Sequence, residues 1–236
     1  MNQNVKNEAL ELLDTSIDTY KAYPIPKVTY FDLNPLYKNK ELLKKVVRLC
    51  IDKVSELKYQ NQSALLPHID YIACIESRGF IIGSILANIF KKGIVLLRSK
   101  PGRLPGTTTL IKHTLEYGDA QMEVQNGVGK VLIFDDVLAT GGTSQAATDL
   151  LIKAGYTPLH ALFLLELTYC NPSLSKIGYD SLLVKEEDPY TYTKAKPKAK
   201  PKAKAKPKSK TSKKKTTKKK TTKSKVNILE VSEDAK

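Results

Sequence analysis

Short, continuous runs of Ile, Val and Leu alternate with helical patterns over the middle of the chain, between residues 71 and 165. Continuous apolar runs are typical of strands that are covered on both faces, and the intervening helices favour parallel pairing. The sequence therefore predicts an α/β fold with a mainly parallel central sheet flanked by helices. Strands are expected over 71–75, 93–97, 130–134 and 159–165, with helices over 79–90 and 143–154.

Two further helical patterns precede this alternation. Apolar residues recur at helical intervals within residues 1–21 and again within 37–57. Pro24 and Pro26 end the first pattern, because each proline removes a backbone donor and restrains the residue before it. The apolar positions of the first pattern are Ala9, Leu10, Leu12, Leu13, Ile17 and Tyr20.

Residues 100–124 interrupt the alternation. A segment rich in Gly, Pro and Thr is followed by the polar alternation Gln121-Met122-Glu123-Val124-Gln125, and this pattern favours a loop and an antiparallel hairpin. Long insertions within compact α/β domains are more often functional than structural. We therefore interpret residues 100–124 as a flexible flap inserted in the sheet.

The net charge of +15 is concentrated near the C-terminus. Residues 194–225 contain 17 lysines and no acid, while the rest of the chain has 22 basic and 24 acidic residues. A segment almost without large apolar groups cannot offset the entropy cost of ordering, so residues 191–236 are predicted to form a disordered, Lys-rich tail. Such a polycation favours binding to nucleic acid or another polyanion. A solubilising spacer and a targeting signal stay open as alternatives.

The cysteines and the hydropathy pattern indicate the compartment. Cys50, Cys74 and Cys170 form no CxxC pair and have no His at metal-ligand spacing, so we interpret them as reduced thiols. The N-terminal residues mix acids into their apolar positions, and no run approaches the roughly 18 apolar residues of a membrane span. We therefore expect a soluble, cytoplasmic protein with no membrane span.

The run VLIFDDVLATGGTS, residues 131–144, carries the clearest chemical signal. A buried strand ends in two carboxylates, a loop of small residues follows, and a helix begins near Thr143. At the carboxyl end of a parallel strand, loop amides and the helix N-terminus point toward one spot, which suits a phosphate. Asp135 and Asp136 are interpreted as acceptors for a ribose diol or as outer ligands of Mg2+.

The alternative for this run is structural: the two acids cap a turn and the glycines end a strand. The convergence of strand end, acid pair, glycine loop and helix start argues against it. The chain contains neither GxxxxGKS/T nor GxGxxG, which disfavours a simple nucleotide-binding kinase or dehydrogenase. No role is assigned to His68, His113 or His160, because none neighbours a Ser or Cys nucleophile signature.

Thirteen residues of this run, VLIFDDVLATGGT, resemble the phosphoribosyl pyrophosphate (PRPP) motif of the type I phosphoribosyltransferases. The DDVLATGGT part is similar to that of the adenine phosphoribosyltransferases in particular. Three more segments agree in the family's order: ESRGF at 76–80, KPGRLP at 100–105 and LEYG at 115–118. The resemblance implies the type I phosphoribosyltransferase fold, with residues 1–36 as an N-terminal hood segment contributing to the base pocket and residues 37–190 as the core.

The same resemblance implies a reaction of adenine with PRPP to AMP and pyrophosphate, with Mg2+ carried by PRPP and no direct metal ligand in the protein. It assigns the ribose hydroxyls to Asp135 and Asp136. It implies that the pyrophosphate is bound by Arg78, at a strand-to-helix turn, and by Lys100 and Arg103 on the flap. It also implies that the 5′-phosphate is bound by the loop residues Ala139, Thr140, Gly141, Gly142 and Thr143. An ordinary surface arginine is the alternative for Arg78.

The resemblance implies that Glu116, the acid of LEYG, is the catalytic group that exchanges a proton with the purine near N7. The alternative is that Glu116 is a solvent-exposed charge on the hairpin. The base-pocket segment departs from the family's pattern. Tyr30 stands where the family has a stacking Phe, and Thr29 and Phe31 beside it are expected to offer backbone groups to the adenine edge. The alternative is that Tyr30 or Phe31 belongs to the core. Just before the flap, Ser99 stands where the family usually has a basic residue, and Arg98 lies one position earlier.

The leading hypothesis is thus an adenine phosphoribosyltransferase of purine salvage. A homodimer is expected, because flap residues in this family often complete the partner's site. Two alternatives stay open: another purine or xanthine phosphoribosyltransferase with the same PRPP site, and a PRPP-sensing regulator whose tail binds nucleic acid.

Overall fold

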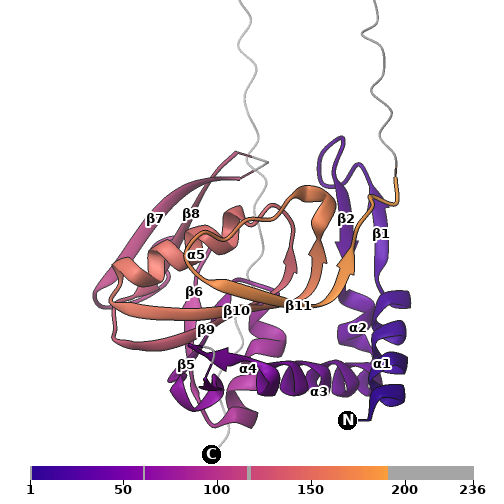
Figure 1. Cartoon of the computed structure of the whole chain (residues 1–236). Coiled ribbons are helices and arrows are strands. Elements are labelled where there is room, and N and C mark those ends of the chain that lie inside the picture. Colours follow the sequence, from indigo (N-terminus) through magenta and orange to yellow (C-terminus); the bar gives the residue numbers. More distant parts are fainter. Residues whose placement is uncertain (1, 61, 116–117, 191–236) are drawn as a thin grey trace, which may run out of the picture. The chain divides into compact units, whose positions relative to one another are not determined.

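In a computed structural model, which describes residues 2–60, 62–115 and 118–190, a five-stranded parallel sheet forms the centre of the fold (Figure 1). The strand order is β11-β10-β9-β5-β6, and every neighbouring pair is parallel. The predicted mainly parallel sheet is confirmed. Its strands are β5 (Tyr71–Ile75), β6 (Gly93–Leu97), β9 (Gly129–Leu138), β10 (Tyr156–Leu167) and β11 (Gly178–Lys185).

Helices cover both faces of the sheet. In Figure 1, α5 (Gly142–Lys153) lies on one face, and α3 (Lys40–Glu56) and α4 (Gly79–Phe90) lie on the other. Alternate residues of a strand point to opposite faces. Leu132 and Phe134 of β9 accordingly join the buried cluster of α3 and α4, whereas Val131 and Ile133 join the cluster of α5.

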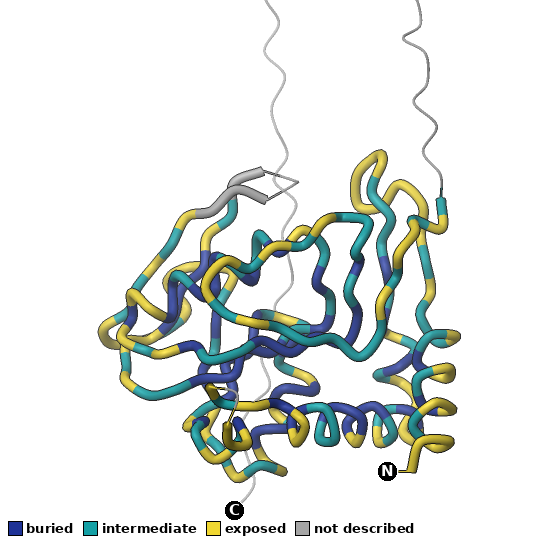
Figure 2. The backbone as a smooth tube through the Cα atoms, in the orientation of Figure 1, coloured by how far each residue is buried: buried dark blue, intermediate teal, exposed yellow. Residues whose placement is uncertain are grey.

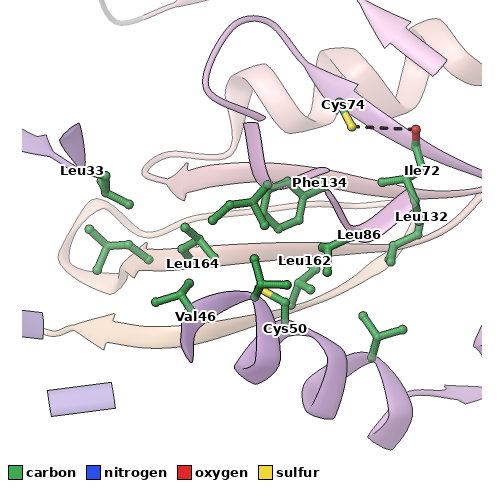
Figure 3. Packing of buried hydrophobic residues seen from close by; sticks show 14 of the residues in the cluster. Leu33, Val46, Cys50, Ile72, Cys74, Leu86, Leu132, Phe134, Leu162 and Leu164 are labelled. Carbon is green, nitrogen blue, oxygen red and sulfur yellow. Dashed lines mark hydrogen bonds between the residues drawn. The ribbon is translucent and has the colours of Figure 1, made fainter. Parts of the chain in front are cut away.

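The larger cluster is built from helix and sheet side chains that interlock. Figure 3 shows Phe134 and Leu132 of β9 beside Leu162 and Leu164 of β10, with Cys50 of α3 below them. The tube in Figure 2 is buried mainly along the central strands, and its exposed stretches lie on the hairpins and outer helix faces. This packing fixes the carboxyl ends of the strands, where functional loops of parallel sheets usually lie.

The N-terminal region combines helices and a hairpin. Its elements are α1 (Gln3–Thr15), β1 (Asp18–Lys21), β2 (Thr29–Asp32) and α2 (Asn34–Lys38). Asn39 ends α2 and caps α3, because its side chain accepts hydrogen bonds from the amides of Glu41 and Leu42 at 3.1 Å. The predicted helix over 37–57 is therefore divided at Asn39.

Two other antiparallel pairs lie outside the central sheet. The flap hairpin consists of β7 (Thr108–Leu115) and β8 (Gly118–Gln125), as expected from the sequence. The remaining elements are β3 (Lys58–Tyr59), β4 (Ser63–Ala64) and the 3-10 turns η1 (Leu66–His68) and η2 (Thr168–Cys170). None of the helices in the described ranges is long and apolar enough to cross a membrane.

The predicted elements are mostly confirmed, but several short or edge strands were not predicted, among them β2, β3 and β4. The ranges of β5, α4 and β6 agree with the prediction, and β9 continues four residues beyond Phe134, through Asp135 and Asp136. The expected helical pattern over 1–21 is wrong after Thr15, because residues 18–21 pair with β2 as a strand. Strand β11 was not predicted. By internal contacts the chain divides into Met1–Thr193 and Lys194–Lys236, and the predicted tail over 191–236 lies outside the described residues.

Candidate active site

One cavity of about 350 Å³ lies where three segments of the chain meet. The hood strand β2, the turn between β5 and α4, and the end of β9 with the loop into α5 supply its walls. The lining includes every residue predicted for the base, the ribose and the 5′-phosphate: Thr29, Tyr30, Phe31, Asp135, Asp136, Ala139, Thr140, Gly141, Gly142 and Thr143. The structure thus brings residues more than a hundred positions apart around one space.

The loop between β9 and α5 packs against the backbone of Ser173. Gly141, the residue before α5, has a φ of +88°, a left-handed conformation that favours glycine. A Cβ atom at Gly141 would lie 2.6 Å from the Ser173 carbonyl oxygen, and the Ser173 amide donates to the Thr140 carbonyl at 3.2 Å. The first amides of a helix lack partners within it. Because Gly142 and Thr143 line the cavity, this helix start can receive a phosphate.

Asp135 and Asp136 place two carboxylates at the end of β9. Burial and the adjacent Asp136 carboxylate raise the pKa of Asp135 well above its ordinary value. Burial also raises the pKa of Asp136, although Arg78 and the Tyr37 hydroxyl act in the opposite direction. Asp136 is 1% exposed, and its Oδ2 lies 2.9 Å from Arg78 Nε and accepts from the Tyr37 hydroxyl at 3.3 Å. Two buried, adjacent carboxylates are electrostatically unfavourable, and hydrogen bonds from the hydroxyl groups of a ligand would stabilise their charged form.

Arg78 joins three walls of the cavity. While its Nε pairs with Asp136, its Nη1 donates to the Tyr30 hydroxyl at 3.2 Å and to the Phe31 carbonyl at 3.4 Å. Burial lowers the pKa of Arg78, but the facing Asp136 carboxylate outweighs this effect and the net pKa is raised. Arg78 is therefore a half-buried cation inside the site, which does not fit the alternative of an ordinary surface arginine.

The aromatic residues of β2 take different positions. Phe31 is 4% exposed, and its side chain belongs to the same buried cluster as Leu13 of α1. The core alternative thus applies to the Phe31 side chain, while its carbonyl faces Arg78. The Tyr30 ring lies 5.5 Å from the Arg78 guanidinium carbon and meets the Tyr23 ring edge-on at 5.2 Å. A tyrosine ring on a cavity wall suits stacking against a purine.

The start of the flap is tied to the cavity through Glu76. Glu76 lines the cavity, and its Oε2 accepts from the Ser99 amide at 2.6 Å and from the Ser99 hydroxyl at 3.0 Å. Its Oε1 lies 3.3 Å from Arg98 Nη2 and 3.9 Å from Arg103 Nη1. Burial raises the pKa of Glu76, but the Ser99 hydrogen bonds and the two arginines outweigh it and the net pKa is lowered.

The structure does not bring the flap cations into the cavity. Within the described ranges, neither Lys100 nor Arg103 lines it, and Lys100 is exposed. Arg98 is turned to Glu76, at the end of β6. Glu123 of β8 holds this segment through hydrogen bonds from the amides of Gly102 at 2.8 Å and Arg103 at 3.4 Å. The predicted catalytic residue Glu116 lies outside the described residues.

Several residues around the site were not predicted. Glu76 stands in the ESRGF segment, so a motif signal was present although no role was inferred. Tyr37 contacts Asp136 across 99 positions, and Ser173 supports the phosphate loop from a segment without any recognisable pattern. Asp188, which accepts from the Thr29 hydroxyl at 2.7 Å, gave no signal either. Contacts of this kind depend on tertiary packing.

Comparison with known proteins gives the class that this fold and site define. Residues 33–166 match the family described as the phosphoribosyl transferase domain. The chain belongs to this family. Among its curated relatives, the adenine phosphoribosyltransferase of Bdellovibrio bacteriovorus is 42% identical over 63% of this chain and 84% of its own. That of Thermosipho africanus is 39% identical over 68% of this chain and 90% of its own.

Solved structures agree with this placement. The adenine phosphoribosyltransferase of Rhodothermus marinus matches with a TM-score of 0.62 at 33% identity, over 75% of this chain and 99% of that one. The Saccharomyces cerevisiae enzyme, solved with adenine and an imino-altritol bisphosphate, matches with a TM-score of 0.64 at 28% identity and the same coverage. Within the phosphoribosyltransferases, the chain thus groups with the adenine phosphoribosyltransferases, and the predicted fold class is confirmed.

Proposed function

We propose that the protein transfers the phosphoribosyl group of PRPP to adenine and releases AMP and pyrophosphate, a reaction of purine salvage. The observation that carries this proposal is that a phosphate loop, an acid pair and an aromatic wall line the same cavity. In the reaction, the bond from ribose C1′ to the pyrophosphate oxygen breaks, a bond from C1′ to adenine N9 forms, and one proton leaves the imidazole ring of adenine. The relatives named as adenine phosphoribosyltransferases support the same reaction.

Different residues of the described chain bind different parts of PRPP. The loop over 139–143 holds the 5′-phosphate, and Asp135 and Asp136 accept hydrogen bonds from the ribose hydroxyls. Arg78 is already charged and half-buried at the cavity, so its guanidinium is preorganised to bind the leaving pyrophosphate. Lys100 and Arg103 complete the pyrophosphate contacts when the flap closes over the cavity.

Mg2+ is proposed to enter with PRPP. The described residues contain no group of three or more His, Cys, Asp or Glu that could hold a metal ion, whereas the cavity offers the Asp135 and Asp136 carboxylates. These residues fit an ion whose ligands come mainly from substrate phosphates and water. When bound, Mg2+ neutralises charge on the pyrophosphate as the C1′–O bond breaks.

Glu116 is proposed as the proton-transfer residue of the LEYG segment. Its carboxyl exchanges a proton with the purine near N7 while adenine attacks C1′. A Glu116→Gln variant keeps the size of the side chain but cannot accept the proton. We expect its rate of pyrophosphate release to fall about a hundredfold or more, in the range of general acid–base effects. A rate within about threefold of the wild type would remove Glu116 from the mechanism.

The choice of base is tested by turnover of adenine, hypoxanthine, guanine and xanthine side by side. Each is mixed with PRPP and Mg2+, and nucleotide and pyrophosphate are quantified. Nucleotide formation with adenine and little or none with the other bases is the expected result. Turnover restricted to xanthine would favour the second phosphoribosyltransferase hypothesis. Binding of PRPP without turnover of any base would favour the PRPP-sensing regulator.

The Lys-rich tail is proposed to bind a polyanion such as nucleic acid. Its 17 lysines without an acid are counted within residues 194–225, and such a polycation releases counterions when it binds DNA or RNA. Deleting residues 194–236 is expected to abolish DNA binding at low salt and to leave AMP formation unchanged. Equal DNA binding by the truncated and full-length proteins would refute this role.

A homodimer is proposed on the exposed face of α4. Ile81 and Ile89 are 38% and 43% exposed, and Ile85 lies between them at helical spacing. Ile94, on the edge strand β6, is 41% exposed. A second copy of the chain covers this apolar surface. Analytical ultracentrifugation is expected to show a dimer that an Ile81→Asp, Ile89→Asp variant turns into a monomer, and a monomeric wild type would contradict the proposal.

A cytoplasmic location is proposed from the thiols. Cys50 and Cys74 are buried, free thiols. Burial raises the pKa of Cys74 to about 12, so this thiol stays protonated and unreactive. Unpaired thiols are typical of proteins of reducing compartments. Fractionation of the source cells checks the proposal, and recovery of the protein outside the cytoplasmic fraction would overturn it.

A further inference from the structure

The hairpin that carries the base wall is too small to hold its own shape. Strands β1 and β2 have four residues each, and three of the four residues of β1 are exposed. Isolated two-stranded hairpins are marginally stable in water. Nevertheless Thr29, Tyr30 and Phe31 of β2 must lie at fixed positions if they are to receive a purine. Contacts from elsewhere in the chain are needed to hold this hairpin.

Two residues after β11 supply such contacts. Asp188 Oδ1 accepts a hydrogen bond from the Thr29 hydroxyl at 2.7 Å and another from the Tyr190 amide at 2.9 Å. The Tyr190 hydroxyl donates to the Thr19 carbonyl at 3.1 Å. The Lys21 ammonium lies 5.7 Å from the centroid of the Tyr190 ring. Asp188 and Tyr190 are hereafter called the C-terminal clamp.

The clamp reaches both strands of the hairpin. Lys21 pairs with Thr29 and Thr19 pairs with Phe31 in the register of β1 and β2. Asp188 therefore contacts β2, Tyr190 contacts β1 at two positions, and the Asp188–Tyr190 hydrogen bond joins the two contacts. Thr29 and Phe31 line the cavity, whereas neither clamp residue is among the cavity-lining residues of the described chain.

We infer that the C-terminal clamp positions the adenine wall, so that Asp188 and Tyr190 are positioning residues for the base. This inference rests on the proposed function. Within the described residues, the hydrogen bonds and the ring contact of the clamp reach the hairpin, whereas Ser173 supports the phosphate loop. Its loss therefore weakens the binding of adenine more than the binding of PRPP.

The clamp also sets where the functional part of the chain ends. It finishes at Tyr190, and the lysine-rich composition begins at Lys194. A truncation after residue 190 keeps both clamp residues, and a truncation after residue 186 removes both. The first variant is expected to keep the wild-type KM for adenine, and the second is expected to raise it. Equal values for the two truncations would overturn the inference.

The point variant Asp188→Ala gives the sharper test, with the exposed neighbour Glu187→Ala as a control for the loss of one negative charge. Asp188→Ala is expected to raise the KM for adenine roughly fivefold, as for the loss of one typical intramolecular hydrogen bond, and to leave the KM for PRPP within about twofold. A Thr29→Val change in the Asp188→Ala background is expected to add little. Equal increases in both KM values would show a merely structural role and overturn the inference.

A second measurement does not depend on enzymatic activity. Amide hydrogen exchange over residues 18–32 is compared in the wild type, Asp188→Ala and Glu187→Ala, without substrate. Faster exchange in Asp188→Ala alone is expected, because the hairpin loses its support. Unchanged exchange would refute the clamp even if adenine turnover is found. Faster exchange without any adenine turnover by the wild type would refute the proposed function and leave only the mechanical role of the clamp.

Discussion

Gly141→Ala is the change that most directly probes the phosphate loop. The glycine has a φ of +88°, and an L-residue in a left-handed conformation costs about 1–2 kcal/mol. The added Cβ would also lie 2.6 Å from the carbonyl oxygen and 3.0 Å from the amide nitrogen of Ser173. Both neighbours are backbone atoms, so the loop or residue 173 must move.

The loss from the left-handed conformation alone corresponds to roughly a five- to thirtyfold factor. A displacement of about 1 Å at a binding site can cost about a hundredfold in rate. We therefore expect kcat/KM for PRPP to fall by about two orders of magnitude, measured by pyrophosphate release at saturating adenine. The melting temperature, measured in parallel, separates this loss from unfolding.

Gly106→Ala is the matched control. Gly106 has a φ of +77°, but a Cβ atom there meets nothing within 4 Å. It therefore carries the conformational cost without the overlap, and it lies in the flap segment and is not among the cavity-lining residues of the described chain. If Gly141→Ala keeps the wild-type kcat/KM for PRPP, or loses no more than Gly106→Ala, the assignment of the phosphate to this loop is wrong.

Three further predictions follow from the site and the core. Asp135→Asn is expected to raise the melting temperature at pH 8 while lowering turnover. The pKa of the buried carboxyl is raised, so its charge destabilises the fold increasingly as pH rises from the pKa in the unfolded chain through the pKa in the folded protein. The gain in melting temperature should therefore shrink toward pH 4. Tyr30→Phe removes the hydroxyl that accepts from Arg78 and is expected to lower kcat/KM about two- to tenfold, with the ring retained for stacking; no change would deny the contact a role. Gly83→Ala forces a Cβ atom against the Cys74 sulfur and is expected to lower the free energy of unfolding in urea by about 1–3 kcal/mol. A Gly83→Ala, Cys74→Ala double variant should recover this stability, and a double variant as unstable as Gly83→Ala would contradict the steric cause.

The central sheet could be predicted because its signals are local. Tyr71–Ile75 and Gly93–Leu97 are short apolar runs next to a strongly apolar helix, and the structure keeps their predicted limits. The phosphate loop is also a contiguous run, in which glycines, hydroxyl residues and acids follow a strand. Chemistry that is confined to one loop can be recognised without knowledge of the fold.

The strands β1 and β11 were missed for different reasons. In β1, helical spacing continues into Ile17 and Tyr20, but antiparallel pairing of residues 18–21 with β2 gives a strand instead. In β11, Gly178–Lys185 is half-buried at the edge of the sheet and lacks a continuous apolar run. Tertiary pairing overrides or replaces local preference at both places.

The cross-chain contacts of the site could not be predicted from motifs. Tyr37 and Asp136 meet across 99 positions, and Thr29 and Asp188 meet across 159. Neither Tyr37 nor Asp188 belongs to a recognisable motif. Arg78 was predicted as a pyrophosphate contact, but its simultaneous contacts with Tyr30, Phe31 and Asp136 required the fold.

The measurement that tests the central claim most directly is a crystal structure of the protein with AMP. We expect the phosphate within hydrogen-bond distance of the backbone amides of residues 140–143, the ribose hydroxyls at Asp135 and Asp136, and the purine against the Tyr30 ring, all within the same cavity. A nucleotide bound elsewhere, or bound in this cavity with its phosphate away from the loop after β9, would contradict it.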